Sequence, residues 1–127
     1  MPINLRFRLQ TGAHAIPLRR VYRVAGFASL AGEPDEYFLG WLSFHGRQVP
    51  VFDLNRVVCD APTPEDFGSR IILVETAPDA AVPHVGLLAA GVTDTCAAED
   101  PAVAPLDVDL YLQMLANFIP PAPAENS

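Results

Sequence analysis

The residues of this chain that could do acid–base chemistry are three histidines and three aspartates: His14, His45, His84, Asp53, Asp107 and Asp109. A carboxylate held beside a histidine can serve as a general base in hydrolysis. The histidines are scattered, and none stands at a spacing typical of a catalytic motif. We interpret Asp53 as the cap of a short helix, and Asp107 and Asp109 as acidic residues at the start of a longer one. A small hydrolase that pairs Asp53 or Asp107 with a histidine is therefore the weaker hypothesis.

The sequence contains no metal or cofactor motif. It has no phosphate-binding glycine loop, no dinucleotide fingerprint and no zinc-spaced set of cysteines and histidines. Cys59 and Cys96 lie far apart and outside any CxxC pattern, which favours reduced structural thiols over a disulfide. We therefore expect no catalytic residue, no metal and no cofactor.

The charge balance excludes two classes of partner. Fifteen acidic residues stand against eight arginines, no lysine is present, and the formal net charge is −7. Proteins that bind nucleic acid or acidic lipid usually show the opposite balance. No apolar run approaches about 20 residues, and the first residues lack the features of a secretion signal. We expect a cytoplasmic protein that binds no nucleic acid and does not insert into a membrane.

The elements that must position these residues are mostly strands. Alternating or continuous apolar runs predict extended segments, in chain order, over residues 4–10, 14–18, 19–24, 38–44, 48–52, 70–75 and 84–92. The third of these is interpreted as a strand or a bend. Asp53 precedes a short helical turn over 54–58, and the acidic segment 93–105, rich in proline and alanine, is predicted to be a loop.

One convincing helix is predicted, over residues 107–118. Its apolar face is expected to carry the i, i+4 stripe of Leu106, Leu110, Met114 and Phe118, with Tyr111 and Leu115 beside this stripe. The loop 61–66 is the predicted boundary between two lobes. The first lobe spans about residues 14–66 together with the strand at 4–10, and the second spans about residues 67–105.

The second hairpin carries more large apolar side chains than one inward face can hold: Phe38, Leu39, Trp41, Phe44, Val49, Val51 and Phe52. Successive residues of a strand point to opposite faces, so some of these side chains lie on the other face. The favoured interpretation is that all of them belong to the core of a small barrel. The alternative is that some form a recognition surface for another protein.

This hairpin resembles the hallmark segment of the CheW-like domain family, which has the form G-x-x-N-x-R-G-x-x-x-P-V-x-D-L. Residues 40–54 stand here as GWLSFHGRQVPVFDL. The opening strands, the pair at 71–74 and 85–88, and residues 106–109 (LDVD) resemble further segments of the family in the same order. The resemblance covers roughly residues 5 to 115. Each piece is short, so the specificity comes from the ordered set.

The resemblance implies both a fold and a function. The family's members are scaffold proteins that couple chemoreceptors to the CheA histidine kinase in bacterial chemosensory arrays. The implied fold is mainly β, with two small five-stranded barrel lobes that share an apolar interface and one C-terminal helix. The implied function is a non-enzymatic adaptor. Its partners would be the regulatory domain of a histidine kinase and a methyl-accepting chemoreceptor.

Two groups of contact residues are expected from the resemblance. Apolar residues at the junction of the lobes would pack together and make the kinase-type contact: Trp41, Phe44, Val49, Val51 and Phe52. The receptor-type contact is expected at Arg23, His45 and Arg47.

Two of these positions depart from the family pattern. Arg23 stands where the family often has glutamate, and His45 stands where it usually has arginine. Glutamate and arginine can form an ion pair, whereas an arginine would repel a protonated histidine. We therefore hypothesise a receptor-facing surface altered for a different partner. The alternative function is a divergent adaptor of a surface-sensing or pilus-control system that binds a different protein.

A third departure is the length of the chain between Val92 and Leu106. The family normally has more chain there, including another strand pair. The second lobe is therefore expected to be incomplete, or to be completed by another chain. Because an open strand edge invites pairing, we also expect a homodimer.

Overall fold

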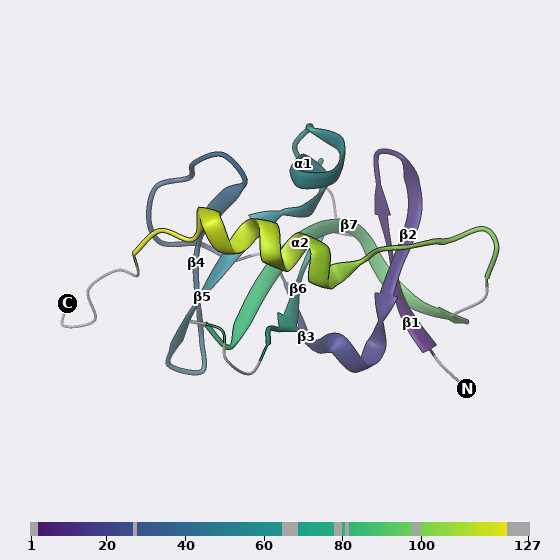
Figure 1. The fold of residues 1–127 in the computed structure, drawn as a ribbon, viewed down its shortest axis with the longest axis horizontal. Helices are drawn as coiled ribbons and strands as arrows, with labels where there is room; N and C mark the ends of the chain where they lie inside the picture. Colours follow the sequence, from purple (N-terminus) through teal and green to yellow (C-terminus); the bar gives the residue numbers. More distant parts are fainter. Residues whose placement is uncertain are drawn as a thin grey trace.

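The computed structural model describes residues 3–26, 28–64, 69–77, 80, 82–97 and 100–121. Its strands are β1 (Ile3–Leu9), β2 (Gly12–Pro17), β3 (Val21–Gly26), β4 (Phe38–Phe44), β5 (Arg47–Asp53), β6 (Arg70–Glu75), β7 (His84–Ala97) and β8 (Ala104–Pro105). The helices are α1 (Leu54–Cys59) and α2 (Val108–Leu115), with short 3-10 turns η1 (Leu18–Arg20) and η2 (Ala116–Phe118). The expectation of a mainly β chain with one main C-terminal helix is confirmed (Figure 1).

The long strand β7 joins two halves of one open sheet. Its residues 84–89 pair with β6 on one side, and residues 86–88 pair in parallel with β5 on the other; β3 and β4 extend this half at its two ends. Its residues 90–97 pair with β1, which continues to β2 and β8. We call these the curled half and the open half. The name curled half reflects the backbone pairing of Ala31 with Trp41, which brings the chain after β3 back to β4.

Gly91 marks the point at which β7 passes from one half to the other. Its φ of +60° is a left-handed conformation that glycine adopts without steric cost. A Cβ atom at this position would lie 2.9 Å from Cγ of Arg8. The β1–β7 register also shifts between Arg6 and Arg8. A glycine is therefore needed where the strand bends and the Arg8 side chain crosses it.

The sheet buries apolar residues on both of its faces in the curled half. One face packs a small cluster: Leu42, Val49, Val51, Ile71, Leu73 and Leu88. The other face belongs to a larger cluster, which also takes in β1, β2 and α2. Neighbouring residues such as Leu87 and Leu88 go to different clusters, as strand alternation requires. This two-sided burial accounts for the crowded apolar hairpin in the sequence.

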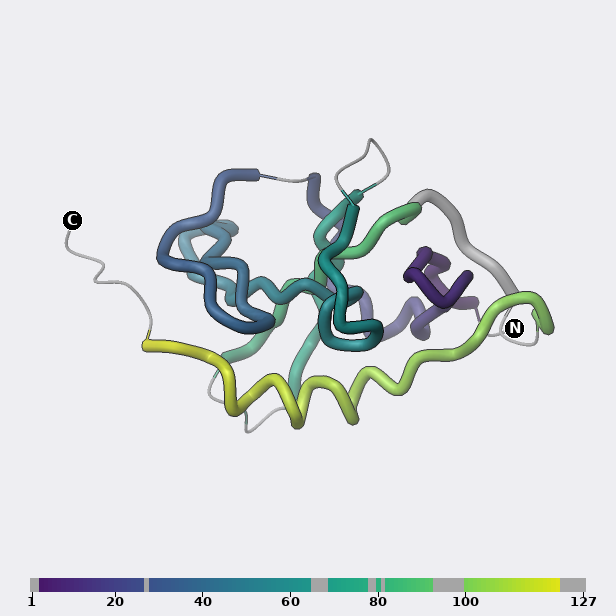
Figure 2. Tube along the Cα trace, turned by 90° about the horizontal axis from the view of Figure 1, so that it is seen from above, coloured from purple at the N-terminus to yellow at the C-terminus, as the bar shows by residue number. Residues whose placement is uncertain are grey.

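Helix α2 runs along one side of the molecule, from the open half past the curled half (Figure 2). Its buried residues are Val108 and Leu115, with Tyr111 and Leu112 packed beside them. The predicted stripe was wrong at Leu110 and Phe118, which are 58% and 37% exposed. The face toward the core is rotated, because residues 108, 111, 112 and 115 also have helical spacing and lie over the sheet.

Strand pairing bears on two further predictions, the loop over 93–105 and the lobe boundary near residue 66. The loop predicted over 93–105 was wrong in part, since β7 continues to Ala97 and Ala104–Pro105 forms β8. Strand pairing also crosses the predicted lobe boundary near residue 66, because β3 pairs with β6 and β5 pairs with β7. The division into lobes stays a prediction. Within the described ranges, no helix is long and apolar enough to cross a membrane.

Candidate functional site

The carboxylate of Asp53 is buried and serves as a structural acceptor. It is 5% exposed and accepts a hydrogen bond from the backbone N–H of Arg56, which caps α1. The backbone N–H of Thr63 donates to Oδ2 of Asp53 at 2.9 Å, and the Thr63 hydroxyl donates to Oδ1. The interpretation of Asp53 as a cap is confirmed. Its oxygens hold the segment after α1 against the sheet.

The other two aspartates at the predicted helix start also have structural partners. Asp107 caps α2 by accepting a hydrogen bond from the backbone N–H of Leu110 at 3.2 Å. Asp109 forms an ion pair with Arg20 at 2.8 Å, and the same guanidinium donates to the backbone oxygen of Glu75. Across the described residues no carboxylate lies within ion-pair distance of a histidine, and no group of three or more potential metal ligands occurs.

His14 lies in the open half, where its ring stacks on Phe7 with centroids 6.3 Å apart. Its Nε2 is 2.8 Å from the hydroxyl of Thr11, which is itself 3.8 Å from Sγ of Cys59. Its Nδ1 is buried without a hydrogen-bond partner. Burial lowers the pKa of His14 below its usual value of 6.5, because the charged ring would lose hydration. The pairing state of Cys96 is not visible, since its side chain lies outside the described residues.

Four of the apolar residues expected to contact a partner are buried within the protein. Trp41 and Phe52 belong to the larger cluster, and Val49 and Val51 belong to the smaller one. Phe44, at the end of β4, is half-buried against the smaller cluster. The packing role expected for these residues agrees with their positions. Because these four side chains are buried, a partner could contact them only where a cleft exposes part of one.

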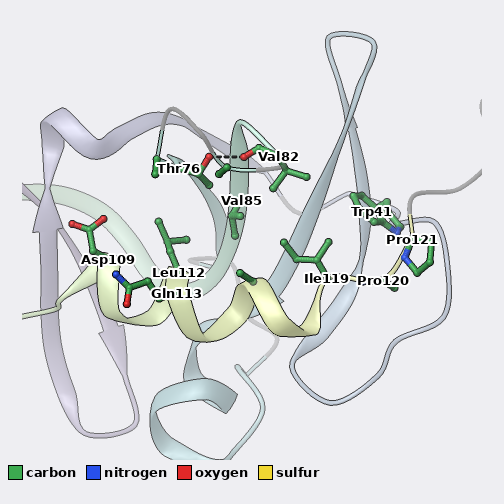
Figure 3. Close-up of a pocket in the computed structure, with 13 residues that line it drawn as sticks. Trp41, Thr76, Val82, Val85, Asp109, Leu112, Gln113, Ile119, Pro120 and Pro121 are labelled. Atoms are coloured by element: carbon green, nitrogen blue, oxygen red, sulfur yellow. Dashed lines mark hydrogen bonds between the residues drawn. The ribbon is translucent and has the colours of Figure 1, made fainter.

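Such a feature is an apolar cleft beside Trp41, with a volume of about 920 Å³. One wall is the flank of α2 and the residues after it, and the other is β7 with the connection that precedes it (Figure 3). Val85 and Leu112 face this space, and Trp41 lies at the end where the chain continues to Pro120. The polar lining side chains are Thr76, Asp109 and Gln113. Nothing in the sequence pattern predicted this cleft, because its two walls come from distant segments.

A second feature, the basic–aromatic surface, lies at the end of the curled half. We define it by Tyr22, Arg23, Phe44, His45 and His84. The Tyr22 ring lies 4.3 Å from the His84 ring and 6.1 Å, edge-on, from the Phe44 ring. The guanidinium of Arg23 lies over Phe44, 5.8 Å from the ring centroid, and His45 packs edge-on against Phe44 at 4.2 Å.

A bulge and a tight turn build this surface. The β3–β6 register shifts between Val21 and Arg23, so Tyr22 is an extra residue in its strand. Such bulges redirect side chains, and here Tyr22 and Arg23 both reach the end of β4. His45 and Gly46, with φ of +51° and +77°, form the two-residue turn between β4 and β5. Arg47 pairs directly with Phe44 in the β4–β5 register, and its side chain is exposed.

The cleft and the basic–aromatic surface lie on opposite faces of the same strands. Val85 lines the cleft, whereas its neighbour His84 packs against Tyr22. On β4, Trp41 belongs to the face of the cleft and Phe44 to the other face. Of the residues expected at the receptor-type contact, Arg23 and His45 are brought together around Phe44. The sequence analysis missed Tyr22 and His84, which no motif marks.

Known proteins resemble this chain both in sequence and in fold. The family model for the CheW-like domain matches residues 4–112. Among solved structures, the scaffolding protein TtCheW from Thermoanaerobacter tengcongensis is similar to this chain, with a TM-score of 0.66 and 23% sequence identity. The match covers 79% of this chain and 64% of that chain, so this chain spans less than two thirds of the length of that relative. A search of curated proteins finds no match. With most of its length matched by the family model, the chain belongs to the CheW-like domain family.

Proposed function

We propose that this protein is a non-enzymatic adaptor of a chemosensory system, which holds a chemoreceptor and the regulatory domain of a CheA-type histidine kinase together in the cytoplasm. Membership of the CheW-like domain family supports the proposal. The similar fold of a protein described as a scaffolding protein agrees with it. In such an adaptor the two partners are joined by contact alone, and no covalent step takes place.

The observation that carries the proposal is the presence of two different surfaces on opposite faces of one sheet. An adaptor must bind two partners at the same time, so its two contacts must not overlap. Val85 and His84 are neighbours in β7, yet one lines the cleft and the other supports the basic–aromatic surface. Both surfaces rest on the curled half, whose strands are buried on both faces.

We assign the receptor-type contact to the basic–aromatic surface, with Arg23, His45 and the adjacent Arg47 as its polar residues. We assign the kinase-type contact to the cleft, where Trp41 forms part of the wall. Val49, Val51 and Phe52 have no access to either surface because they are buried. Their part in the proposed function is to keep the hairpin in shape, and Phe44 supports the receptor-type surface.

The hydrolase hypothesis is disfavoured by the surroundings of its candidate residues. The oxygens of Asp53 accept hydrogen bonds from Arg56 and Thr63 and do not face a histidine. Asp107 is occupied as a helix cap. A general base needs to reach the proton that it removes, and neither carboxylate is placed to do so.

The test is co-purification of the full chain with the kinase regulatory domain and with the cytoplasmic fragment of a receptor, both from the source organism. Ala116→Arg places a long charged side chain on the exposed wall of the cleft and should abolish kinase capture. Asn117→Arg, one residue further on the same turn and outside the cleft lining, is the matched control and should leave capture unchanged. His45→Ala should weaken receptor capture alone. A wild-type chain that captures neither partner would refute the proposed function.

A divergent adaptor of a surface-sensing or pilus-control system is the second candidate. The observation that favours it is the pair Arg23 and His45, two basic residue types that both contact Phe44. Capture of the receptor of such a system, with no capture of a chemotaxis receptor, would support this candidate over the first.

We further propose that the open half pairs with a second copy of the chain. Within the described residues, β7 beyond residue 90 pairs on one side only, with β1. Unpaired strand edges invite pairing with another chain. Sedimentation velocity should then reveal a dimer as the concentration rises, and a monomer that persists at high micromolar concentration would contradict it.

A further inference from the structure

The basic–aromatic surface gathers cationic groups at one end of an acidic chain. In the part of the chain that the structure describes, Arg20 with Asp109 is the ion pair present, so Arg23 and Arg47 have no carboxylate within ion-pair distance. Glu75 stands opposite His84 in the β6–β7 register but forms no ion pair with it. The chain carries a net charge of −7, yet none of the acidic residues that the structure describes forms an ion pair with Arg23 or Arg47.

The guanidinium of Arg23 is restrained by its contact with an aromatic ring. Its position 5.8 Å over the Phe44 ring restrains the side chain, while a cation–π contact uses the flat face of the group. The N–H donors at the edge of the guanidinium remain available, and their planar fork matches the two oxygens of a carboxylate. Holding the arginine in place before binding reduces the entropy lost in the complex.

An exposed aromatic ring lies beside this arginine. Tyr22 is 47% exposed, and its ring and the guanidinium of Arg23 both contact Phe44. Tyrosine and arginine are among the residues that most often dominate binding energy at protein interfaces. A free small anion would make no use of the exposed tyrosine. The combination therefore fits a protein segment that presents both an acidic and an apolar side chain.

We propose that the basic–aromatic surface binds an acidic segment of the receptor-type partner, in which a carboxylate contacts Arg23 and a neighbouring apolar side chain packs on Tyr22. This inference rests on the proposed function and adds the chemistry of the partner. It also explains why Arg23 and His45 can both contact Phe44: the acid that balances the arginine comes from the other protein. A second copy of this chain is a poorer occupant of this surface, because the dimer proposed above pairs through the open half and leaves this end of the curled half uncovered.

The experiment compares two charge reversals in the full-length chain. Arg23→Glu reverses the charge on the surface, and Arg56→Glu makes the same change in net charge on the exposed side of α1, at the opposite edge of the molecule in Figure 1. Binding of each variant is measured against the cytoplasmic receptor fragment and against the kinase regulatory domain, at low and at high salt. Circular dichroism and thermal unfolding verify that both variants are folded.

We expect Arg23→Glu to weaken receptor binding about tenfold or more, because it places like charges in contact. Kinase binding should stay within about twofold, and Arg56→Glu should stay within about twofold for both partners. High salt should weaken the wild type more than Arg23→Glu. A charge reversal from glutamate to arginine in the receptor fragment should restore binding to Arg23→Glu.

Four results would overturn the inference. Unchanged receptor binding by Arg23→Glu would remove this surface from the contact and leave the proposed function standing. Equal weakening by Arg23→Glu and Arg56→Glu would show attraction by overall charge without a specific site. Self-association of the wild type that Arg23→Glu abolishes would make a second copy the occupant. A wild type that binds neither receptor nor kinase refutes the proposed function itself, and the inference with it.

Discussion

The two halves of the sheet share one strand but differ in how tightly that strand is held. In the curled half, β7 has neighbours on both sides and apolar clusters on both faces. In the open half, residues 90–97 of β7 pair with β1 alone among the described strands. Both candidate surfaces lie on the curled half. Binding sites need rigid support to keep their geometry, and both candidate surfaces lie where β7 has neighbours on both sides.

The largest expected loss of stability comes from truncating a buried leucine in the curled half, which leaves a cavity. Leu73 is fully buried in the smaller cluster, and Leu73→Ala should lower the free energy of unfolding by about 3–4 kcal/mol. Leu9→Ala in the open half is the matched change and should cost about 1 kcal/mol less, because a site near an open edge can collapse more easily. Urea denaturation of both variants measures the difference. Equal losses would contradict the contrast between the halves.

Overfilling the same cluster should have the next largest effect. A Cβ atom at Gly86 would lie 2.8 Å from Cγ2 of Ile71 and 3.0 Å from Cγ2 of Val51. Gly86→Val should therefore destabilise the fold by about 2–3 kcal/mol. Gly26→Ala, at the end of β3, is the control, because a Cβ atom there meets nothing within 4 Å. A thermal midpoint for Gly86→Val equal to that of the control would show that the cluster is loosely packed.

A smaller effect is expected at the junction of the halves. Gly91→Ala places a side chain in a left-handed conformation and against Arg8, which should cost about 1–2 kcal/mol. Hydrogen exchange should show faster opening of the β1–β7 amides, with the β6–β7 amides little changed. Faster exchange in both sets would mean that the halves open together and are not separate units.

The smallest effect should be a pH dependence confined to the open half. Burial lowers the pKa of His14 in the folded state relative to 6.5, so the unfolded state binds more protons as the pH falls through that value. The free energy of unfolding should therefore decrease on acidification below about pH 6.5. Above that pH the contribution of the neutral His14 ring to stability is fully present. His14→Gln should flatten part of this decrease, whereas His45→Gln on the exposed turn serves as the control. An identical pH profile for His14→Gln and the wild type would contradict the assignment.

Local pattern was enough to predict most of the strands. The alternation of apolar residues placed β1, β4, β5 and β6 close to their observed positions, and Asp53 was correctly interpreted as a cap. These features depend on residues a few positions apart. The same alternation predicted that the hairpin has apolar side chains on both faces. It could not predict which segments cover those faces.

Features that depend on distant pairing were beyond the sequence. The acidic segment after Val92, rich in proline and alanine, resembled a loop, and its pairing with β1 is what makes it strand up to Ala97. The bulge at Tyr22 exists only relative to β6, so the juxtaposition of Tyr22 with His84 had no local signal. The face of α2 was ambiguous because two overlapping stripes were apolar, and packing on the sheet selected the one that contains Leu115.

The pairing of β1 with the last part of β7 has a consequence for biogenesis. The ribosome delivers Ile3 long before its partner Ala97, so the edge of β1 that faces β7 stays uncovered until β7 has been synthesised, while β2 covers the other edge. Contacts between such remote segments slow the search for the native topology. The open half therefore forms only after residue 97 has been synthesised, and a product that terminates before residue 90 would keep an aggregation-prone hairpin without its partner.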